Sequence, residues 1–149
     1  MDSVDVGTSL MREFNQISKN LNSMDKLATD VTHAIHAGNV TTSEKHVHVL
    51  LKTSSLCREL GGVIGILCKS GKDRTSMGVT LDMARGLNEA SGVTTSTANI
   101  CQLLRLHGTR RANVYANTGH LTYAFNFMQR SLLPVCFKPP HGSFSGGET

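Results

Sequence analysis

One short segment of the chain combines a thiol, a glycine and several charged side chains. It reads Cys68-Lys69-Ser70-Gly71-Lys72-Asp73-Arg74-Thr75, with the cysteine six positions before the arginine. A phosphate needs several converging donors, and a loop that leads into a helix supplies backbone N–H groups and the positive end of the helix dipole. Gly71 allows a turn where a Cβ would collide, and Arg74 can bind two oxygens with its planar guanidinium. The segment therefore predicts a phosphate-binding loop, with further substrate contacts from Lys69, Ser70, Gly71 and Lys72.

Cys68 is the predicted nucleophile of this loop. Backbone N–H groups and nearby positive charges surround its thiol, so we expect a depressed pKa and a thiolate at neutral pH. These charges belong to Lys69, Lys72 and Arg74. In-line attack of Cys68 on phosphorus would form a cysteinyl-phosphate that water then hydrolyses. Thr75 is expected to donate its hydroxyl to the sulfur and ease its departure; no metal and no cofactor is required.

A leaving alcohol also needs a proton. Asp73 is the candidate general acid, because it is the only one of six aspartates that lies inside the loop. The alternative is that Asp73 only holds Arg74 or a neighbouring lysine in place, with the acid supplied from elsewhere in the chain.

Two other interpretations of the segment compete with this one. A nucleotide-binding loop has the pattern G-x-x-x-x-G-K-[ST], but Ile66 stands at its first glycine and Asp73 stands where a hydroxyl must bind magnesium. The second interpretation is a buried structural cysteine beside a solvated run of charges. The glycine, the two lysines and Thr75, placed between two apolar patterns, favour the phosphate loop.

The flanking patterns predict how the loop is held. Val63–Leu67 is a short, β-branched apolar run bounded by glycine, which is typical of a buried strand. After Arg74, apolar residues recur at helical spacing as far as Gly92. Strand, loop and helix in this order predict an α/β fold: a helix-rich domain of the cysteine-phosphatase type with a strand, phosphate loop and helix at its centre.

The rest of the chain is expected to be mostly helical. Apolar residues at helical spacing predict helices within the first sixty residues, interrupted near Ser23. Later helices are expected over 97–107 and from about Thr118 until Pro134 closes the last one. Residues 139–149, rich in proline, glycine and serine, are expected to form an irregular tail. With 149 residues, of which 39% are hydrophobic, we expect one domain with one core, 1–149.

Composition restricts the partners and the setting. A net charge of +4 and a pI of about 9.0 favour anionic partners, and the loop favours a phosphorylated substrate over nucleic acid. The four cysteines show no CxxC spacing, so a reducing, cytosolic setting is expected. No leader-like pattern follows Met1, and the apolar runs are too short to cross a bilayer, so membrane contact is expected to be peripheral.

Several other residues are candidates for function, and each has a simpler explanation. Two histidine pairs suggest a metal but lack an HExxH pattern or a cysteine partner; they are His33 with His36 and His46 with His48. Three arginines suggest contacts with acidic lipid headgroups, although a solvated loop is the favoured interpretation; they are Arg105, Arg110 and Arg111. The cysteines outside the loop are expected to fill the core, with Cys57 an alternative resolving thiol; they are Cys57, Cys101 and Cys136.

Longer strings of the sequence carry a family resemblance. The octet resembles the signature of cysteine-dependent phosphoinositide phosphatases, and "CKSGKDRTSMGVTL" resembles that of the inositol polyphosphate 4-phosphatases. Two further stretches are similar to that family, "EKHVHVLLKTSSLCRELGGV" before the loop and "YAFNFMQRSLLPVCFKPPHGSF" near the end. The resemblance covers roughly Glu44 to Thr149. Gly71 departs from it, because animal members usually have alanine there.

The resemblance implies a function for the chain. Cys68 would be the nucleophile, Arg74 would bind the transferred phosphate, and Lys69 and Lys72 would face the additional phosphates of the inositol ring. The reaction would be hydrolysis of the 4-phosphate of phosphatidylinositol 3,4-bisphosphate, in the cytoplasm at the cytosolic face of a membrane. Family members are much longer, so the chain would correspond to the C-terminal catalytic portion.

Two alternative functions stay open. A protein tyrosine or dual-specificity phosphatase uses the same chemistry, although two lysines provide more charge than a single phosphate needs. A catalytically incomplete phosphoinositide-binding module would keep the loop and bind the lipid without hydrolysing it, because upstream catalytic sequence would be missing.

Overall fold

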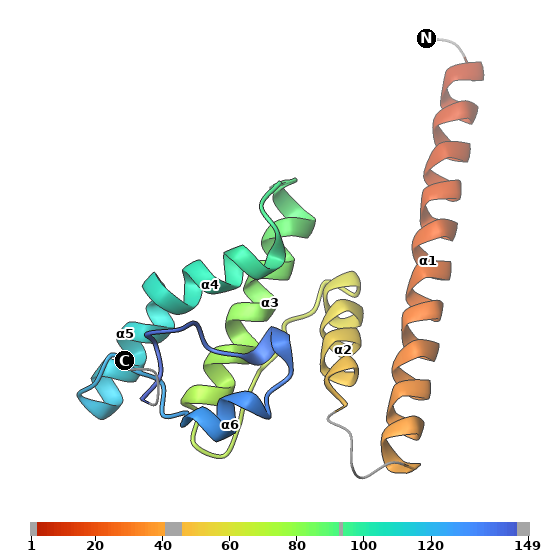
Figure 1. The fold of residues 1–149 in the computed structure, drawn as a ribbon. Helices are drawn as coiled ribbons and strands as arrows, with labels where there is room; N and C mark the ends of the chain where they lie inside the picture. Colours follow the sequence, from red (N-terminus) through yellow and green to blue (C-terminus); the bar gives the residue numbers. More distant parts are fainter. Residues whose placement is uncertain (1–2, 41–45, 93, 146–149) are drawn as a thin grey trace. The chain divides into compact units, whose positions relative to one another are not determined.

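A computed structural model of the chain describes residues 3–40, 46–92 and 94–145. The chain forms two compact units, divided between Ile64 and Gly65, and each is considered by itself. Figure 1 shows the helices in chain order. Among the helices that the structure describes, none combines the length and the apolar character that crossing a bilayer would require.

The first unit consists of two packed helices, α1 (Ser3–Val40) and α2 (Val47–Glu59). α1 is continuous through Ser23, so the predicted interruption there is wrong. A single serine costs a helix only a few tenths of a kcal/mol, about 0.5 relative to alanine, and this region contains no proline. The helical propensity of the residues on both sides of Ser23 is therefore sufficient to keep α1 continuous.

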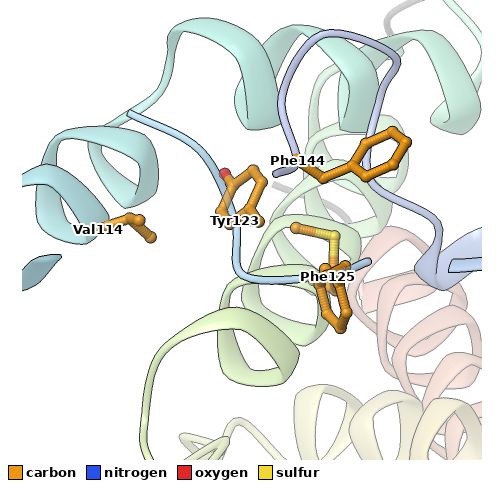
Figure 2. Packing of buried hydrophobic residues seen from close by; sticks show 5 residues of the cluster. Val114, Tyr123, Phe125 and Phe144 are labelled. Carbon is orange, nitrogen blue, oxygen red and sulfur yellow. The ribbon is translucent and has the colours of Figure 1, made fainter. Parts of the chain in front are cut away.

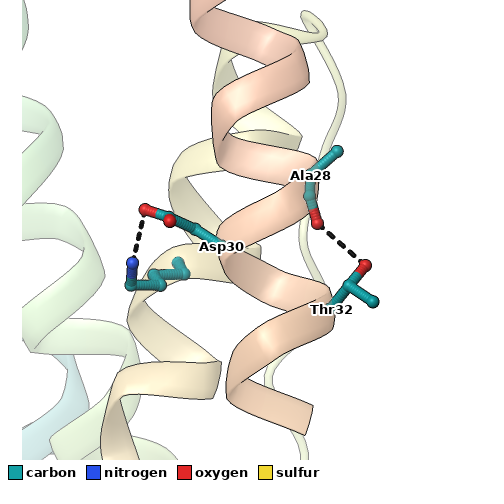
Figure 3. A network of polar contacts seen from close by, with 4 residues as sticks. Ala28, Asp30 and Thr32 are labelled. Atoms are coloured by element: carbon teal, nitrogen blue, oxygen red, sulfur yellow. Dashed lines mark hydrogen bonds and ion pairs between the residues drawn. The ribbon is translucent and has the colours of Figure 1, made fainter. Parts of the chain in front are cut away.

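An ion pair joins these two helices (Figure 3). Asp30 on α1 forms an ion pair with Lys52 on α2, and this contact lowers the pKa of the Asp30 carboxyl. Ala34, one turn further along α1, is buried. On the same helix the Thr32 hydroxyl donates to the Ala28 carbonyl at 3.0 Å, a bond within α1 that adds nothing to the pairing.

The second unit contains the remaining helices and one short 3-10 turn. In chain order they are α3 (Asp73–Ser91), α4 (Thr97–His107), α5 (Thr109–Thr118), α6 (Phe127–Ser131) and η1 (Val135–Phe137). The helices predicted after Arg74 and over 97–107 are confirmed. α3 packs against α4, α5 and η1, and it begins at the end of the phosphate loop, so the central helix of the unit positions the site.

The core of the second unit lies beside the first turns of α3 (Figure 2). It consists of Met77, Val114, Tyr123, Phe125 and Phe144. Figure 2 shows the Tyr123 and Phe125 side chains on the segment that follows α5, with Phe144 on the C-terminal segment. Full burial of one such side chain contributes about 1.5–3 kcal/mol, so this cluster holds three distant segments together at the start of α3.

The predicted α/β fold is wrong. Val63–Leu67 forms no strand, and the part of the chain that the structure describes contains none; its single β-type pairing is an isolated bridge between Tyr123 and Phe144. The side chains of Val63 and Leu67 are 96% and 89% exposed. A strand needs neighbouring extended backbone for its hydrogen bonds, and none of the described residues forms a strand that could supply it. A short apolar run carries no information about such partners, so the pattern misleads.

Ile66 attaches the segment before the loop to α3. A Cβ at Gly78, in the second turn of that helix, would lie 3.0 Å from Cγ2 of Ile66. The absence of a side chain at Gly78 therefore permits a close approach of the two segments. Packing of one side chain on a helix takes the place of the predicted sheet.

The helix predicted from Thr118 to Pro134 is mostly absent. α5, which was not predicted, ends at Thr118, and α6 spans only five residues. Between them Tyr123 is drawn toward the C-terminal segment, because its N–H donates to the Ser143 carbonyl at 2.7 Å. The apolar periodicity here is misleading, since Met128 on the predicted inner face is 72% exposed.

The C-terminal segment is irregular and buried. Residues 139–145 form no helix, and the side chains of Ser143 and Phe144 are almost completely inaccessible. Ser143 donates its hydroxyl to the Pro140 carbonyl at 2.7 Å. Positions 146–149 of the expected tail lie outside the described residues. The end of the described chain therefore contributes to the core.

Arg105 is buried in the second unit, with 1% of its surface exposed. Its guanidinium donates to the Thr80 hydroxyl at 3.0 Å and to three backbone carbonyls, those of Met77 at 3.1 Å, Cys136 at 2.8 Å and Lys138 at 3.0 Å. Both predicted roles of Arg105, contact with lipid headgroups and membership of a solvated loop, are therefore wrong. It joins α3, α4 and the η1 region instead.

Candidate active site

The candidate loop connects Leu67 to α3. Gly71 has a φ of +66°, which L side chains rarely adopt, and its N–H donates to the Cys68 carbonyl at 3.3 Å, closing a turn. Lys72 is the N-cap of α3, so the first-turn N–H groups of that helix lie at the end of the loop. A loop that leads into a helix N-terminus is thus present, without the predicted strand before it.

Cys68 is surrounded by hydrogen-bond donors. The Thr75 hydroxyl donates to Sγ of Cys68 at 3.0 Å, and this contact is the largest of the influences that lower the pKa of Cys68 to about 6. Burial acts in the opposite direction, and the backbone N–H groups of Ser70, Thr75 and Gly71 lower the pKa further. Cys68 is therefore mostly a thiolate at pH 7. Hydrogen-bond donors, more than the neighbouring lysines, are the main cause.

Replacing Thr75 by valine is expected to raise the pKa of Cys68, because the thiolate loses its strongest donor while the packing volume is kept. In the wild type, alkylation by iodoacetamide should accelerate through about pH 6 and level off above about pH 7. In Thr75→Val the rise should move to higher pH. Rates measured between about pH 5 and 9 test this, with Thr75→Ser, which keeps the hydroxyl, as the control. An unchanged profile in Thr75→Val would contradict the assignment.

Two consecutive carbonyls at the end of the loop accept hydrogen bonds from side chains, one of α5 and one of α3. Nη2 of Arg110 donates to the Gly71 carbonyl at 3.1 Å, and the Ser76 hydroxyl donates to the Lys72 carbonyl at 2.7 Å. Nε of Arg110 also donates to the Ser76 hydroxyl at 3.3 Å. Arg110 lies in the first turn of α5 and not in a solvated loop. Sequence reasoning missed both the contact of Arg110 and the role of Ser76.

Asp73 connects the start of α3 to the segment after α5. Its Oδ1 accepts a hydrogen bond from the backbone N–H of Ala124 at 2.9 Å. Ala124 is exposed, but it follows the buried Tyr123, so the hydrogen bond ties the carboxylate to a segment that is anchored in the core. The observed partner is a main-chain amide and not the arginine or lysine considered from the sequence.

The predicted phosphate-binding residues lie together on the loop. Lys69, Ser70 and Arg74 are exposed, and Lys72 is half-buried. Thr75, by contrast, is buried, with its hydroxyl on the sulfur. The positive side chains of Lys69 and Arg74 are therefore accessible from solvent, whereas Cys68 is half-buried.

The remaining candidates lie elsewhere. All four cysteines are free, and Cys101 is a core residue whose thiol donates to the Thr80 carbonyl at 3.7 Å, whereas Cys136 is half-buried. Cys57 belongs to the first unit, and its role as a resolving thiol stays a prediction. Within the described residues, no group of three or more His, Cys, Asp or Glu side chains is placed to hold a metal ion.

The sequence of the chain is similar to a known protein family. Residues 10–137 match the family described as INPP4A C-terminal domain. The chain belongs to this family. The match runs from α1 to η1 and includes the whole loop, so the INPP4A C-terminal domain extends further toward Met1 than the resemblance suggested. The resemblance to inositol polyphosphate 4-phosphatases is confirmed.

Two similar proteins illustrate the relationship. The type II inositol 3,4-bisphosphate 4-phosphatase of Rattus norvegicus is 32% identical over 116 residues, which is 77% of this chain and 12% of the relative. The inositol polyphosphate 4-phosphatase type II of Homo sapiens is 33% identical over 106 residues, 70% of this chain and 12% of the relative. The chain thus spans a small part of the length of these relatives. No solved structure matches it.

Proposed function

We propose that the chain is a phosphomonoester hydrolase that removes the 4-phosphate from phosphatidylinositol 3,4-bisphosphate. The observation that carries the proposal is the hydrogen bond from Thr75 to a Cys68 thiol of pKa about 6, in a loop that leads into the N-terminus of α3. A nucleophilic cysteine needs a depressed pKa and donors that favour the thiolate. Both are present at the site where the sequence predicts phosphate binding.

The proposed reaction has two steps. The Cys68 thiolate attacks phosphorus in line, an S–P bond forms, and the P–O bond to the inositol ring breaks as the alcohol leaves with a proton. Water then attacks the cysteinyl-phosphate, the S–P bond breaks, and inorganic phosphate and the thiolate are released. Arg74 binds two oxygens of the phosphoryl group in both steps. Thr75 donates to the sulfur as its negative charge returns.

The proposed substrate rests on the relatives and on charge. The names of two relatives describe 4-phosphatases of inositol 3,4-bisphosphate. Around the loop, Lys69 and Arg74 are exposed and Lys72 is half-buried, which is more positive charge than one phosphate requires. The lysines therefore suit a ring that carries a second phosphate. Such a lipid would be met in the cytoplasm, by peripheral association with the cytosolic face of a membrane.

Asp73 is our candidate for the general acid, and an asparagine in its place separates this role from positioning. Asp73→Asn keeps an oxygen for the Ala124 N–H but cannot donate the proton of a carboxylic acid. We expect it to slow release from an alkyl phosphate about a hundredfold and to affect an aryl phosphate little, because an aryl leaving group needs little protonation. Steady-state rates on both substrates test this. Equal losses would assign Asp73 to positioning alone.

A second candidate function rests on the exposed positive side chains of the loop, Lys69 and Arg74. They would bind the phosphorylated headgroup without a reaction at Cys68. The chain would then act as a phosphoinositide-binding module.

Phosphate release from vesicles that contain different bisphosphorylated inositol lipids, beside a phosphotyrosine peptide, tests the proposal. We expect release from the 3,4-bisphosphate alone. Preference for the peptide would indicate a protein phosphatase. Binding to the vesicles without release, abolished in Arg74→Ala, would indicate the binding module.

A further inference from the structure

The outer side of the phosphate loop is held by a connected pair of side chains. The Gly71 carbonyl accepts from Nη2 of Arg110 at 3.1 Å, and the next carbonyl, that of Lys72, accepts from the Ser76 hydroxyl at 2.7 Å. Nε of Arg110 donates to the same hydroxyl at 3.3 Å. Ser76 is fully buried and Arg110 is half-buried, whereas the Gly71 carbonyl lies at the exposed end of the arrangement. Two consecutive carbonyls of the loop are therefore bonded on one side.

The direction of these carbonyls matters for anion binding. In a planar trans peptide the N–H points away from the carbonyl of the same unit, so a carbonyl bonded on the outside leaves its amide facing the other way. An anion site made of backbone needs amides that converge and carbonyls that turn away. The contact of Arg110 imposes this arrangement on the unit that follows Gly71. The Lys72 carbonyl is held in addition by the first main-chain hydrogen bond of α3, from the Ser76 N–H at 2.9 Å.

Gly71 makes an external restraint necessary. Its φ is +66°, but glycine adopts positive and negative φ about equally readily, so its own sterics do not keep it there. Its amide is also one of the donors to the Cys68 thiolate. The turn from the Gly71 N–H to the Cys68 carbonyl at 3.3 Å restrains the peptide unit before Gly71, and the contact of Arg110 restrains the unit after it. The two contacts together limit rotation about Gly71 and so limit the movement of its amide.

We propose that Arg110 is a positioning residue that keeps the phosphate loop in its anion-binding conformation through the Gly71 carbonyl and the Ser76 hydroxyl. The inference rests on the proposed function, in that the anion is taken to be the phosphate of the substrate. Arg110 acts through the loop and from outside it. Lysine in its place lacks the planar fork that reaches both acceptors at once.

Arg111 provides a matched control. It lies in the same turn of α5, is likewise half-buried, and donates to two backbone carbonyls, those of Leu121 at 3.0 Å and Leu106 at 2.7 Å. Neither carbonyl belongs to the loop. Arg110→Met and Arg111→Met therefore remove the same headgroup and comparable hydrogen bonds, and similar losses of thermal stability are expected for both.

The experiment measures the reactivity of Cys68, which does not depend on turnover. The rate of its alkylation by iodoacetamide is followed by mass spectrometry between about pH 5 and 9, with and without tungstate as a tetrahedral oxyanion. The titratable and charged groups around the loop stay the same in the variants to be compared. They are Lys69, Lys72, Asp73, Arg74 and Tyr123.

In Arg110→Met we expect the pH midpoint of alkylation to move upward, because the amide donors are no longer held toward the thiolate. The tungstate concentration that halves the rate should rise about tenfold, the effect of losing one hydrogen bond to a charged group. Arg110→Lys should lie between the wild type and Arg110→Met. Arg111→Met should match the wild type in both measurements.

Identical pH profiles and identical tungstate protection in Arg110→Met and Arg111→Met would overturn the proposal, whether both match the wild type or both change. Circular dichroism establishes that the variants are folded. If Arg110→Met does not fold, Arg110→Lys provides the test. A pH profile and a tungstate protection equal to those of the wild type in Arg110→Lys would also overturn the proposal. Shifted reactivity in Arg110→Met without phosphate release from any lipid would retain the positioning role and reject the proposed activity.

Discussion

Replacing Cys68 by serine is expected to reduce phosphate release by at least about a thousandfold. The thiol of Cys68 has a pKa of about 6 and is mostly ionised at pH 7, whereas a serine hydroxyl is not. Arg74 and the loop amides would still bind the phosphate, so affinity for the lipid should change little. Release of phosphate from vesicles containing phosphatidylinositol 3,4-bisphosphate measures the first effect, and sedimentation with the vesicles measures the second.

Cys136→Ser is the control for this experiment. Cys136 is a half-buried free cysteine of the same unit, outside the loop, and its replacement should leave release unchanged. A second readout identifies the intermediate: acid quenching with radiolabelled substrate should trap label on Cys68 of the wild type and none on the Cys68→Ser variant. Release that persists in Cys68→Ser would remove Cys68 as the nucleophile.

Replacing Arg74 by lysine is expected to lower the rate about a hundredfold or more while the charge is retained. Arg74 is exposed in the first turn of α3, where its guanidinium can bind two oxygens of the phosphoryl group. Lysine can offer only a single ammonium group, so both the geometry and the second hydrogen bond are lost. Turnover numbers on the lipid, and tungstate protection of Cys68, measure this loss.

Arg85→Lys is the matched control for Arg74→Lys. Arg85 lies on the same helix, about three turns after Arg74, and its guanidinium pairs with the Glu89 carboxylate at 4.0 Å. It is outside the loop. Its replacement should leave turnover and tungstate protection at wild-type levels. If Arg74→Lys retains full activity, positive charge alone suffices at this position and the two-oxygen contact is wrong.

Local signals in the sequence predict the helices well where one face is buried. α3 and α4 follow apolar periodicity between clear end signals, and both lie where the pattern indicates. α5 is missed because only Val114 of its residues is buried, so it has no apolar stripe; its end signal, Gly119 with a φ of +74°, is the only local clue. The strand fails for another reason: a strand is defined by partners that a local pattern cannot specify.

In the site, too, local contacts are predictable from the sequence and contacts between distant positions are not. The contacts within eight residues, from Thr75 to Cys68 and around Gly71, are predictable because spacing along a loop and a helix turn determines them. The contacts of Asp73 with Ala124 and of Gly71 with Arg110 join positions far apart in the chain. These contacts depend on how α5 and the following segment pack on α3. The spacing of the residues along the chain does not indicate this packing.

The hydrogen bond between Asp73 and Ala124 has a practical consequence for mutagenesis. Its donor is a main-chain amide, as the acceptors of Arg110 and Ser76 are main-chain carbonyls at Gly71 and Lys72. An alanine scan leaves each of these main-chain atoms in place. It would therefore measure only the loss of side chains and would not detect the hydrogen bonds that the main chain makes at these positions. Ala124→Pro, which deletes the amide, or an ester bond in place of the 123–124 peptide would reveal how far the loop depends on the path of the chain.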